Sequence, residues 1–110
     1  MKLPTNTIID PRKVTHYLLV PQATGDKSAY LAGAGYTMET AFRLVADLRT
    51  QVLPHEAAPV ENTVHGQYYE IRVPLTGPNG RTLRICSIWM KEHLSGITKF
   101  ITLVPDKTRK

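Results

Sequence analysis

The sequence is poor in cysteine and in long apolar stretches. Its single cysteine, Cys86, cannot form an internal disulfide, which suits a protein of a reducing compartment. The apolar runs are only a few residues long, too short for a membrane span or for the hydrophobic region of a signal peptide. We therefore expect a soluble cytoplasmic protein with no membrane partner.

The common catalytic and metal-binding signatures are also absent. The sequence contains no C-x-x-C or H-x-x-x-H pair, no G-x-S-x-G, no P-loop and no G-x-G-x-x-G. The glycines of LAGAGY, at 31–36, follow no strand pattern, so they indicate the end of a helix rather than a phosphate-binding loop. We predict no bound metal and no cofactor.

Acidic residues are fewer than basic ones. Lys and Arg number 14 against 9 Asp and Glu, which gives a formal net charge of +5. A field of this sign concentrates anions such as nucleic acid, acidic proteins or phosphorylated ligands. The length of 110 residues fits a single domain over 1–110 with one hydrophobic core. The basic end of the chain, 106–110, is predicted to be a frayed tail.

Helices are predicted in the first half of the chain. Asp10 and Pro11 have the residue types of an N-cap and a first helical position. Asp26 is the candidate N-cap of a short helix that Gly33 or Gly35 closes. These two signals predict two short helices before residue 37.

One long α-helix is predicted over 38–53, METAFRLVADLRTQVL, with Thr37 as its cap. Its apolar residues recur at helical spacing over three turns, which indicates one buried face. Arg43, Asp47 and Arg49 are expected on the solvent side. The following stretch, 55–64, is polar and contains a proline, so we expect a loop.

Three strands are predicted after that loop. The runs 66–75 and 81–90 alternate in polarity and flank TGPNG, a strong hairpin signal. The run 98–105 supplies the third strand. Pro74 has no amide hydrogen, so the first strand is expected at a sheet edge and the second at the centre. The predicted fold class is α+β, with N-terminal helices packed on a three-stranded antiparallel meander.

The register of the hairpin decides which side chains share a face. A four-residue loop would place Arg84 beside Val73, whereas a five-residue loop pairs Val73 with Ile85. Burial favours the second register. The outer face of the sheet would then hold Tyr68, Arg72 and Arg84, framed by Phe100 and Thr102.

This basic and aromatic face is the candidate functional site, because arginine attracts phosphates and aromatic rings stack on bases. A metal-independent ribonuclease needs a base for the 2′-hydroxyl, an acid for the leaving oxygen and a cation at phosphorus. His65 or Glu70 is the candidate base, and Tyr68 or a second histidine the candidate acid. The predicted catalytic residues are His65, Tyr68, Arg72 and Arg84, and the predicted substrate-binding residues are Lys99, Arg81 and Thr102.

The same side chains also have purely structural interpretations. The arginines and Lys99 can be solvated strand residues, and Glu70 can simply pair with Arg72. Cys86 in mid-strand has the character of a small buried residue rather than a nucleophile.

The order of IDPRKVTHYLLV, LAGAGYTMETAFRLVADLR, YYEIRVPLTGPNGRTLRICSIWM and ITLVP resembles a family of small bacterial proteins of unknown function, over nearly the whole chain. A looser resemblance is to the barnase–EndoU–colicin–RelE group of ribonuclease toxins. It rests on a helical first half followed by an antiparallel meander with basic strands, and on KFITLVP. It implies ribonuclease activity held in check by a cognate antitoxin. The chain lacks the long run of helical Lys and Arg often found in ribosome-dependent members.

Two functions of different classes follow. The first is an RNA-directed protein, as a metal-independent ribonuclease toxin of a toxin–antitoxin pair. The alternative is a non-enzymatic protein-interaction domain, for example a phage- or defence-associated accessory that binds a partner through its sheet edge.

Overall fold

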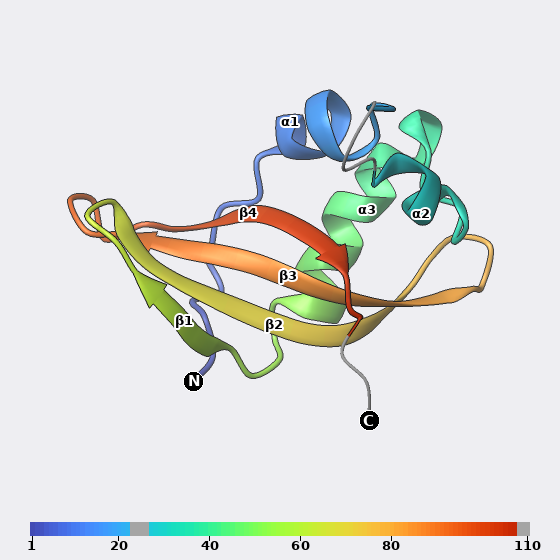
Figure 1. Ribbon diagram of the computed structural model, residues 1–110. Helices are drawn as coiled ribbons and strands as arrows, with labels where there is room; N and C mark the ends of the chain where they lie inside the picture. The colour runs from blue at the N-terminus through green and yellow to red at the C-terminus, as the bar shows by residue number, and fades with distance from the viewer. Residues whose placement is uncertain (23–26, 108–110) are drawn as a thin grey trace.

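The computed structural model describes residues 1–22 and 27–107. Helical segments come first in the chain and strands follow, as the α+β prediction requires (Figure 1). The helical segments are α1 (Pro11–Lys13), η1 (Val14–Leu18), α2 (Ser28–Ala32), η2 (Met38–Thr40), α3 (Ala41–Asp47) and η3 (Leu48–Val52). The strands are β1 (Ala58–Asn62), β2 (Gly66–Thr76), β3 (Thr82–Glu92) and β4 (Thr98–Pro105).

The sheet has four antiparallel strands in the order β1-β2-β3-β4, so the predicted three-stranded meander is wrong by one strand. The extra strand, β1, comes from the stretch predicted as a loop. All its residues are exposed, so burial imposes no alternation of apolar and polar residues on it. Pairing with β2 holds β1 in place, and the sequence pattern of 58–62 does not indicate a strand there.

Because β1 pairs with β2, the prediction that β2 is an edge strand is also wrong. The pairing runs only as far as Ala58 opposite Glu70, so Pro74 lies beyond it and interrupts no hydrogen bond to β1. Further along β2, the side chain of Gln51 binds the strand. The amide N–H of Thr76 donates to Gln51 Oε1 at 2.8 Å, and Gln51 Nε2 donates to the Thr76 carbonyl at 2.9 Å.

The hairpin register is the one that burial favours. Val73 lies opposite Ile85, and a five-residue connection, 77–81, joins Thr76 to Thr82. Between β3 and β4 the register shifts at Ile88 and Trp89. This bulge places Phe100 opposite Trp89 and inside the core, where it is 1% exposed. The prediction that Phe100 frames the outer face is therefore wrong.

Asp10 caps the first helix as predicted, with its side chain accepting from the Arg12 amide. The second helix, α2, ends at Gly33, and its predicted cap Asp26 lies outside the described residues. The prediction of a single long α-helix over 38–53 is wrong, because a 3-10 helix, an α-helix and a π-helix follow one another there. In the last turn the Thr50 hydroxyl donates to the Ala46 carbonyl, a local competitor of the helical hydrogen bonds.

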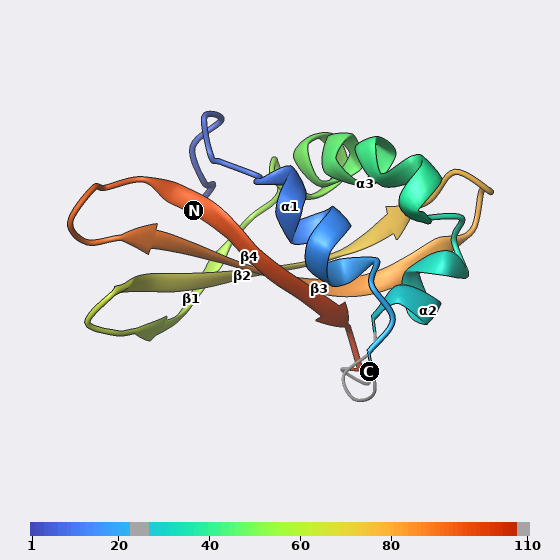
Figure 2. The same cartoon turned by 90° about the horizontal axis from the view of Figure 1, so that it is seen from above.

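The helices cover one face of the sheet, with α3 behind it in Figure 1 and along one side of it in Figure 2. The inward residues of 41–52 are buried as predicted, but Asp47, expected on the solvent side, is only 6% exposed.

The centre of the core is Trp89. Its ring packs edge-on against that of Phe100, with the two ring centroids 5.1 Å apart. Trp89 Nε1 donates to the Ser87 hydroxyl at 2.8 Å. Among the described residues, no helix is long and apolar enough to cross a bilayer.

Candidate functional site

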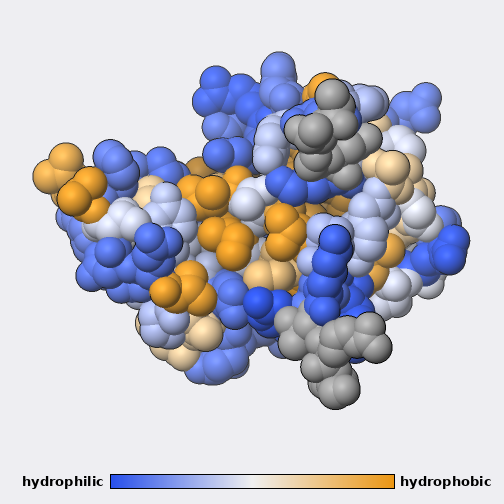
Figure 3. All heavy atoms as spheres, in the orientation of Figure 1, coloured by the Kyte–Doolittle hydropathy of each residue, from blue (hydrophilic) through white to orange (hydrophobic). Residues whose placement is uncertain are grey.

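The helices leave the second face of the sheet uncovered, and the view of Figures 1 and 3 looks onto it. We call it the open face. Strand alternation places on it the residues that do not point into the core. They include Tyr68, Glu70 and Arg72 from β2, Arg84, Cys86, Ile88 and Met90 from β3, and Lys99, Thr102 and Val104 from β4. Apolar surface crosses the middle of this face in Figure 3, with hydrophilic residues around it.

A cluster of two arginines and two carboxylates lies near one end of the open face. Arg72 Nε donates to Glu70 Oε1 at 3.0 Å, and Arg72 Nη1 donates to Asp106 Oδ1 at 2.6 Å. The amide N–H of Asp106 donates to the Arg84 carbonyl at 2.9 Å. Both arginines and Asp106 line a pocket of about 100 Å³, which we call the Arg72/Arg84 pocket. It is lined by Arg72, Val73, Pro74, Arg84 and Asp106.

The charges of this cluster affect the titration of Arg72 and of Cys86. The hydrogen bond to Glu70 raises the pKa of the Arg72 guanidinium above its usual range, and Asp106 acts in the same direction. Burial, with the negative charge of Glu70, raises the pKa of the Cys86 thiol to about 11. This thiol donates to Glu70 Oε2 at 3.6 Å. Cys86 therefore stays protonated at neutral pH and is poorly suited to be a nucleophile.

Lys99 and Thr102 lie on the β4 side of the open face. Lys99 Nζ donates to Glu92 Oε2 at 2.8 Å, so a carboxylate of the same face already balances its charge. The Thr102 hydroxyl accepts from Lys27 Nζ at 3.4 Å, and the same ammonium donates to the Tyr17 hydroxyl at 2.8 Å. Lys27 thus extends the basic surface beyond β4.

His65 does not join the arginine cluster. It lies in the turn between β1 and β2, where its carbonyl accepts from the amide of His93 at 3.1 Å. Seven residues of extended chain separate it from Arg72, or about 23 Å at the rise of a strand. Arg81 lies at the other end of the hairpin, in the connection before β3. The structure thus brings Glu70, Arg72 and Arg84 together and leaves His65 and Arg81 apart from them.

Asp106 is the member of the cluster that the sequence pattern missed. It belongs to the segment predicted as a tail, of which 108–110 lie outside the described residues. Its position follows from the pairing of Pro105 with Ile85, which places the next residue beside Arg84. The bulge in β4 shifts this pairing, so a simple alternation of the strand could not have found it.

The fold and the site define an α+β domain with an open-faced antiparallel sheet and a cluster of charged residues on that face. The family model described as "Domain of unknown function (DUF6883)" matches residues 2–107. The chain therefore belongs to this family, and the prediction of a family of unknown function is confirmed. No curated protein and no solved structure matches the chain. Within 1–22 and 27–107, no three His, Cys, Asp or Glu side chains gather as a metal ion would need.

Proposed function

We propose that this chain is an RNA-directed protein that binds single-stranded RNA across the open face. One observation carries the proposal: Arg72 and Arg84 line one pocket on a sheet face that also presents Tyr68. Guanidinium groups bind phosphate oxygens, and exposed aromatic rings stack on unpaired bases. The net charge of +5 would draw RNA to the protein.

The order of elements supports the same proposal. Helices followed by an antiparallel meander are the layout on which the resemblance to the ribonuclease toxins rests. Shared architecture is only an analogy, so the chemistry has to come from the side chains. We therefore extend the proposal to cleavage on the basis of the charged cluster.

Glu70 is the best-placed base for such a cleavage. It is bound to Arg72 at 3.0 Å, so a phosphate held by Arg72 would lie near its carboxylate. Glu70 would take the proton of the 2′-hydroxyl, and the 2′-oxygen would attack phosphorus. The bond to the 5′-oxygen would break, and Tyr68 or water would protonate that oxygen. The products would be a 2′,3′-cyclic phosphate and a 5′-hydroxyl, and no metal would be needed.

A cleavage assay tests both parts of the proposal. Purified protein is incubated with end-labelled single-stranded RNA in the presence of EDTA, and the ends of the products are analysed. We expect cyclic-phosphate ends and a loss of roughly 10²–10⁴ in rate for Glu70→Gln, the usual contribution of a general base. His65→Ala is expected to retain activity. Arg84→Gln should weaken RNA binding, whereas Arg12→Gln removes the same charge from α1 and should not.

The outcomes separate binding from cleavage. If the protein binds RNA in a manner that depends on Arg84 but does not cleave it, the proposal of RNA binding is supported and that of ribonuclease activity is refuted. A folded protein that neither binds nor cleaves RNA would overturn the proposal. If it acts as a toxin, its expression should arrest growth, Glu70→Gln should relieve the arrest, and a cognate antitoxin should bind it.

A second candidate function has its own observation in favour. Ile88 and Val104 put partly exposed apolar side chains in the middle of the open face, beside the buried Met90. This composition is more usual for a protein interface than for an RNA groove. A protein-interaction domain would bind its partner through this face or through the edge of β1. Capture of one specific partner that Ile88→Asp abolishes and Arg84→Gln leaves intact would favour this function.

A further inference from the structure

The carboxylate of Asp106 lies against Arg72 in the Arg72/Arg84 pocket. Its side chain is only 6% exposed, whereas that of Arg72 is 41% exposed. Arg72 Nη1 donates to Asp106 Oδ1 at 2.6 Å, a short, charge-assisted hydrogen bond. The residue follows the last strand directly, and its amide binds the carbonyl of Arg84 at 2.9 Å.

The charges of the cluster cancel. Glu70 and Asp106 carry two negative charges, and Arg72 and Arg84 carry two positive charges. Arg72 directs Nε towards Glu70 and Nη1 towards Asp106, so both carboxylates use donors that a phosphate would need. A phosphate entering beside Asp106 would meet a like charge within a few ångströms. With Asp106 in place, the pocket is therefore a poor site for an anion.

We propose that the Asp106 carboxylate occupies the place of a phosphate group in the Arg72/Arg84 pocket and that the anion binds by displacing it. Carboxylate and phosphate oxygens accept from guanidinium groups in the same geometry. Asp106 thus restrains the site that the proposed function assigns to RNA, and the inference rests on that function for its biological ligand. The ligand class is a phosphoryl group.

The displacement leaves the paired residues of β3 and β4 in place. The last paired residues of β3 and β4 are Ile85 and Pro105, so Asp106 lies beyond the ladder. Moving it breaks its bonds to Arg72 and to the Arg84 carbonyl but opens no strand. After it leaves, the negative charge of Asp106 is gone from the pocket that Arg72 and Arg84 line.

The test uses inorganic phosphate as the probe. Phosphate is titrated into the full chain, and the Nε–Hε signals of Arg72 and Arg84 are followed by NMR. We expect Asp106→Asn to bind phosphate about tenfold more tightly than the natural protein, because a like charge has left the site. Asp106→Glu keeps the charge and should bind as weakly as the natural protein.

Asp10→Asn is the matched control, since Asp10 also binds an arginine side chain, that of Arg12 at 2.9 Å. It raises the net charge by the same amount away from the pocket and should leave phosphate affinity within twofold. Asp106→Ser is a second neutral variant, and thermal unfolding establishes that each variant is folded. Equal phosphate affinity for Asp106→Asn, Asp106→Ser and the natural protein would overturn the displacement, as would equal tightening by Asp10→Asn.

The same proteins are then titrated with a short single-stranded RNA. If Asp106→Asn binds phosphate more tightly and no variant binds RNA, the displacement of Asp106 by phosphate is supported and the proposed RNA-directed function is refuted. If the natural protein binds RNA but Asp106→Asn increases the affinity for neither phosphate nor RNA, only the displacement is refuted.

Discussion

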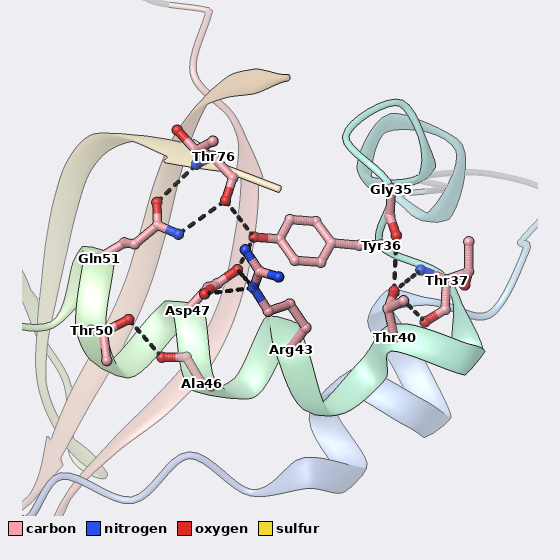
Figure 4. A network of polar contacts seen from close by, with 10 residues as sticks. All are labelled: Gly35, Tyr36, Thr37, Thr40, Arg43, Ala46, Asp47, Thr50, Gln51 and Thr76. Carbon is pink, nitrogen blue, oxygen red and sulfur yellow. Dashed lines mark hydrogen bonds and ion pairs between the residues drawn. The ribbon is translucent and has the colours of Figure 1, made fainter. Parts of the chain in front are cut away.

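The hydroxyl of Tyr36 donates to Asp47 Oδ2 at 2.6 Å inside the protein, where Tyr36 is fully buried (Figure 4). Asp47 also accepts from Arg43 Nε at 3.0 Å, and the Tyr36 hydroxyl lies 3.1 Å from the Thr76 carbonyl. Tyr36 thus connects α3 to the end of β2. A buried carboxylate needs such partners, because leaving one unpaired is costly.

Removal of this hydroxyl should destabilise the fold. Tyr36→Phe deprives the buried Asp47 carboxylate of one donor, so we expect the free energy of unfolding to fall by about 1–3 kcal/mol. Urea denaturation measures the change. Tyr17→Phe removes a surface hydroxyl bound to Lys27 and should cost about 0.5 kcal/mol or less. Equal losses for the two variants would contradict the role assigned to Tyr36.

Stability should fall at alkaline pH in part through Tyr36. Burial, followed by the hydrogen bond to Asp47, raises the pKa of Tyr36 far above its usual value. The folded state therefore favours the neutral phenol, and this contribution is complete below about pH 10, the usual tyrosine pKa. It is lost as the pH rises further, because the unfolded chain then releases the proton. The free energy of unfolding, measured from pH 8 to 12, should depend less steeply on pH for Tyr36→Phe.

The thiol of Cys86 should be inert in the folded protein. Its pKa is raised to about 11, and the residue is only 4% exposed. At pH 8 roughly one molecule in a thousand carries the thiolate. Labelling with an aromatic disulfide reagent should therefore be slow and should accelerate at least about a hundredfold in denaturing urea. Fast labelling without urea would mean that the open face exposes Cys86 more than the structure does.

The hairpin connection should tolerate no side chain at Gly77. A Cβ there would lie 2.1 Å from the Ala34 carbonyl oxygen and 2.6 Å from the Ala34 Cβ, so the connection packs directly on the turn after α2. We expect Gly77→Ala to cost about 3 kcal/mol, the upper end for overpacking. Gly80→Ala adds a Cβ in open space at φ +87° and should cost about 1 kcal/mol through backbone strain. Thermal or urea unfolding measures the loss of stability in each variant. A larger loss for Gly80→Ala than for Gly77→Ala would contradict the close packing of Gly77 on Ala34.

Local chemistry made several features predictable. The cap at Asp10 and Pro11 depends on residues adjacent in sequence, and it is present in the structure. The hairpin register, with Val73 opposite Ile85, was predictable because a shift by one residue would have put these two apolar side chains on opposite faces of the sheet. These features depend on neighbours in the chain or on simple alternation.

Features that depend on distant partners were not predictable in the same way. β1 has no apolar alternation, since it is held by β2 rather than by burial. Phe100 lies on the core face rather than on the open face, because the pairing of β4 with β3 contains a bulge. Asp47 had a position typical of an exposed helical residue, and only the approach of Tyr36 from another segment made it a buried one.

The candidate site also contains features that the sequence predicted and features that it did not. Alternation alone put Tyr68, Glu70 and Arg72 on one face, and the hairpin register added Arg84. The same strand spacing keeps His65, in the turn before β2, away from Arg72. Only the tertiary structure decided that Asp106 lines the pocket with Arg72 and Arg84. The sequence by itself determined the α+β class and the side-chain pattern of each strand, because both depend on short-range periodicity. The tertiary structure decided that Asp106 meets Arg72, because these two residues are 34 positions apart in the chain, whereas Glu70 lies on the same strand as Arg72.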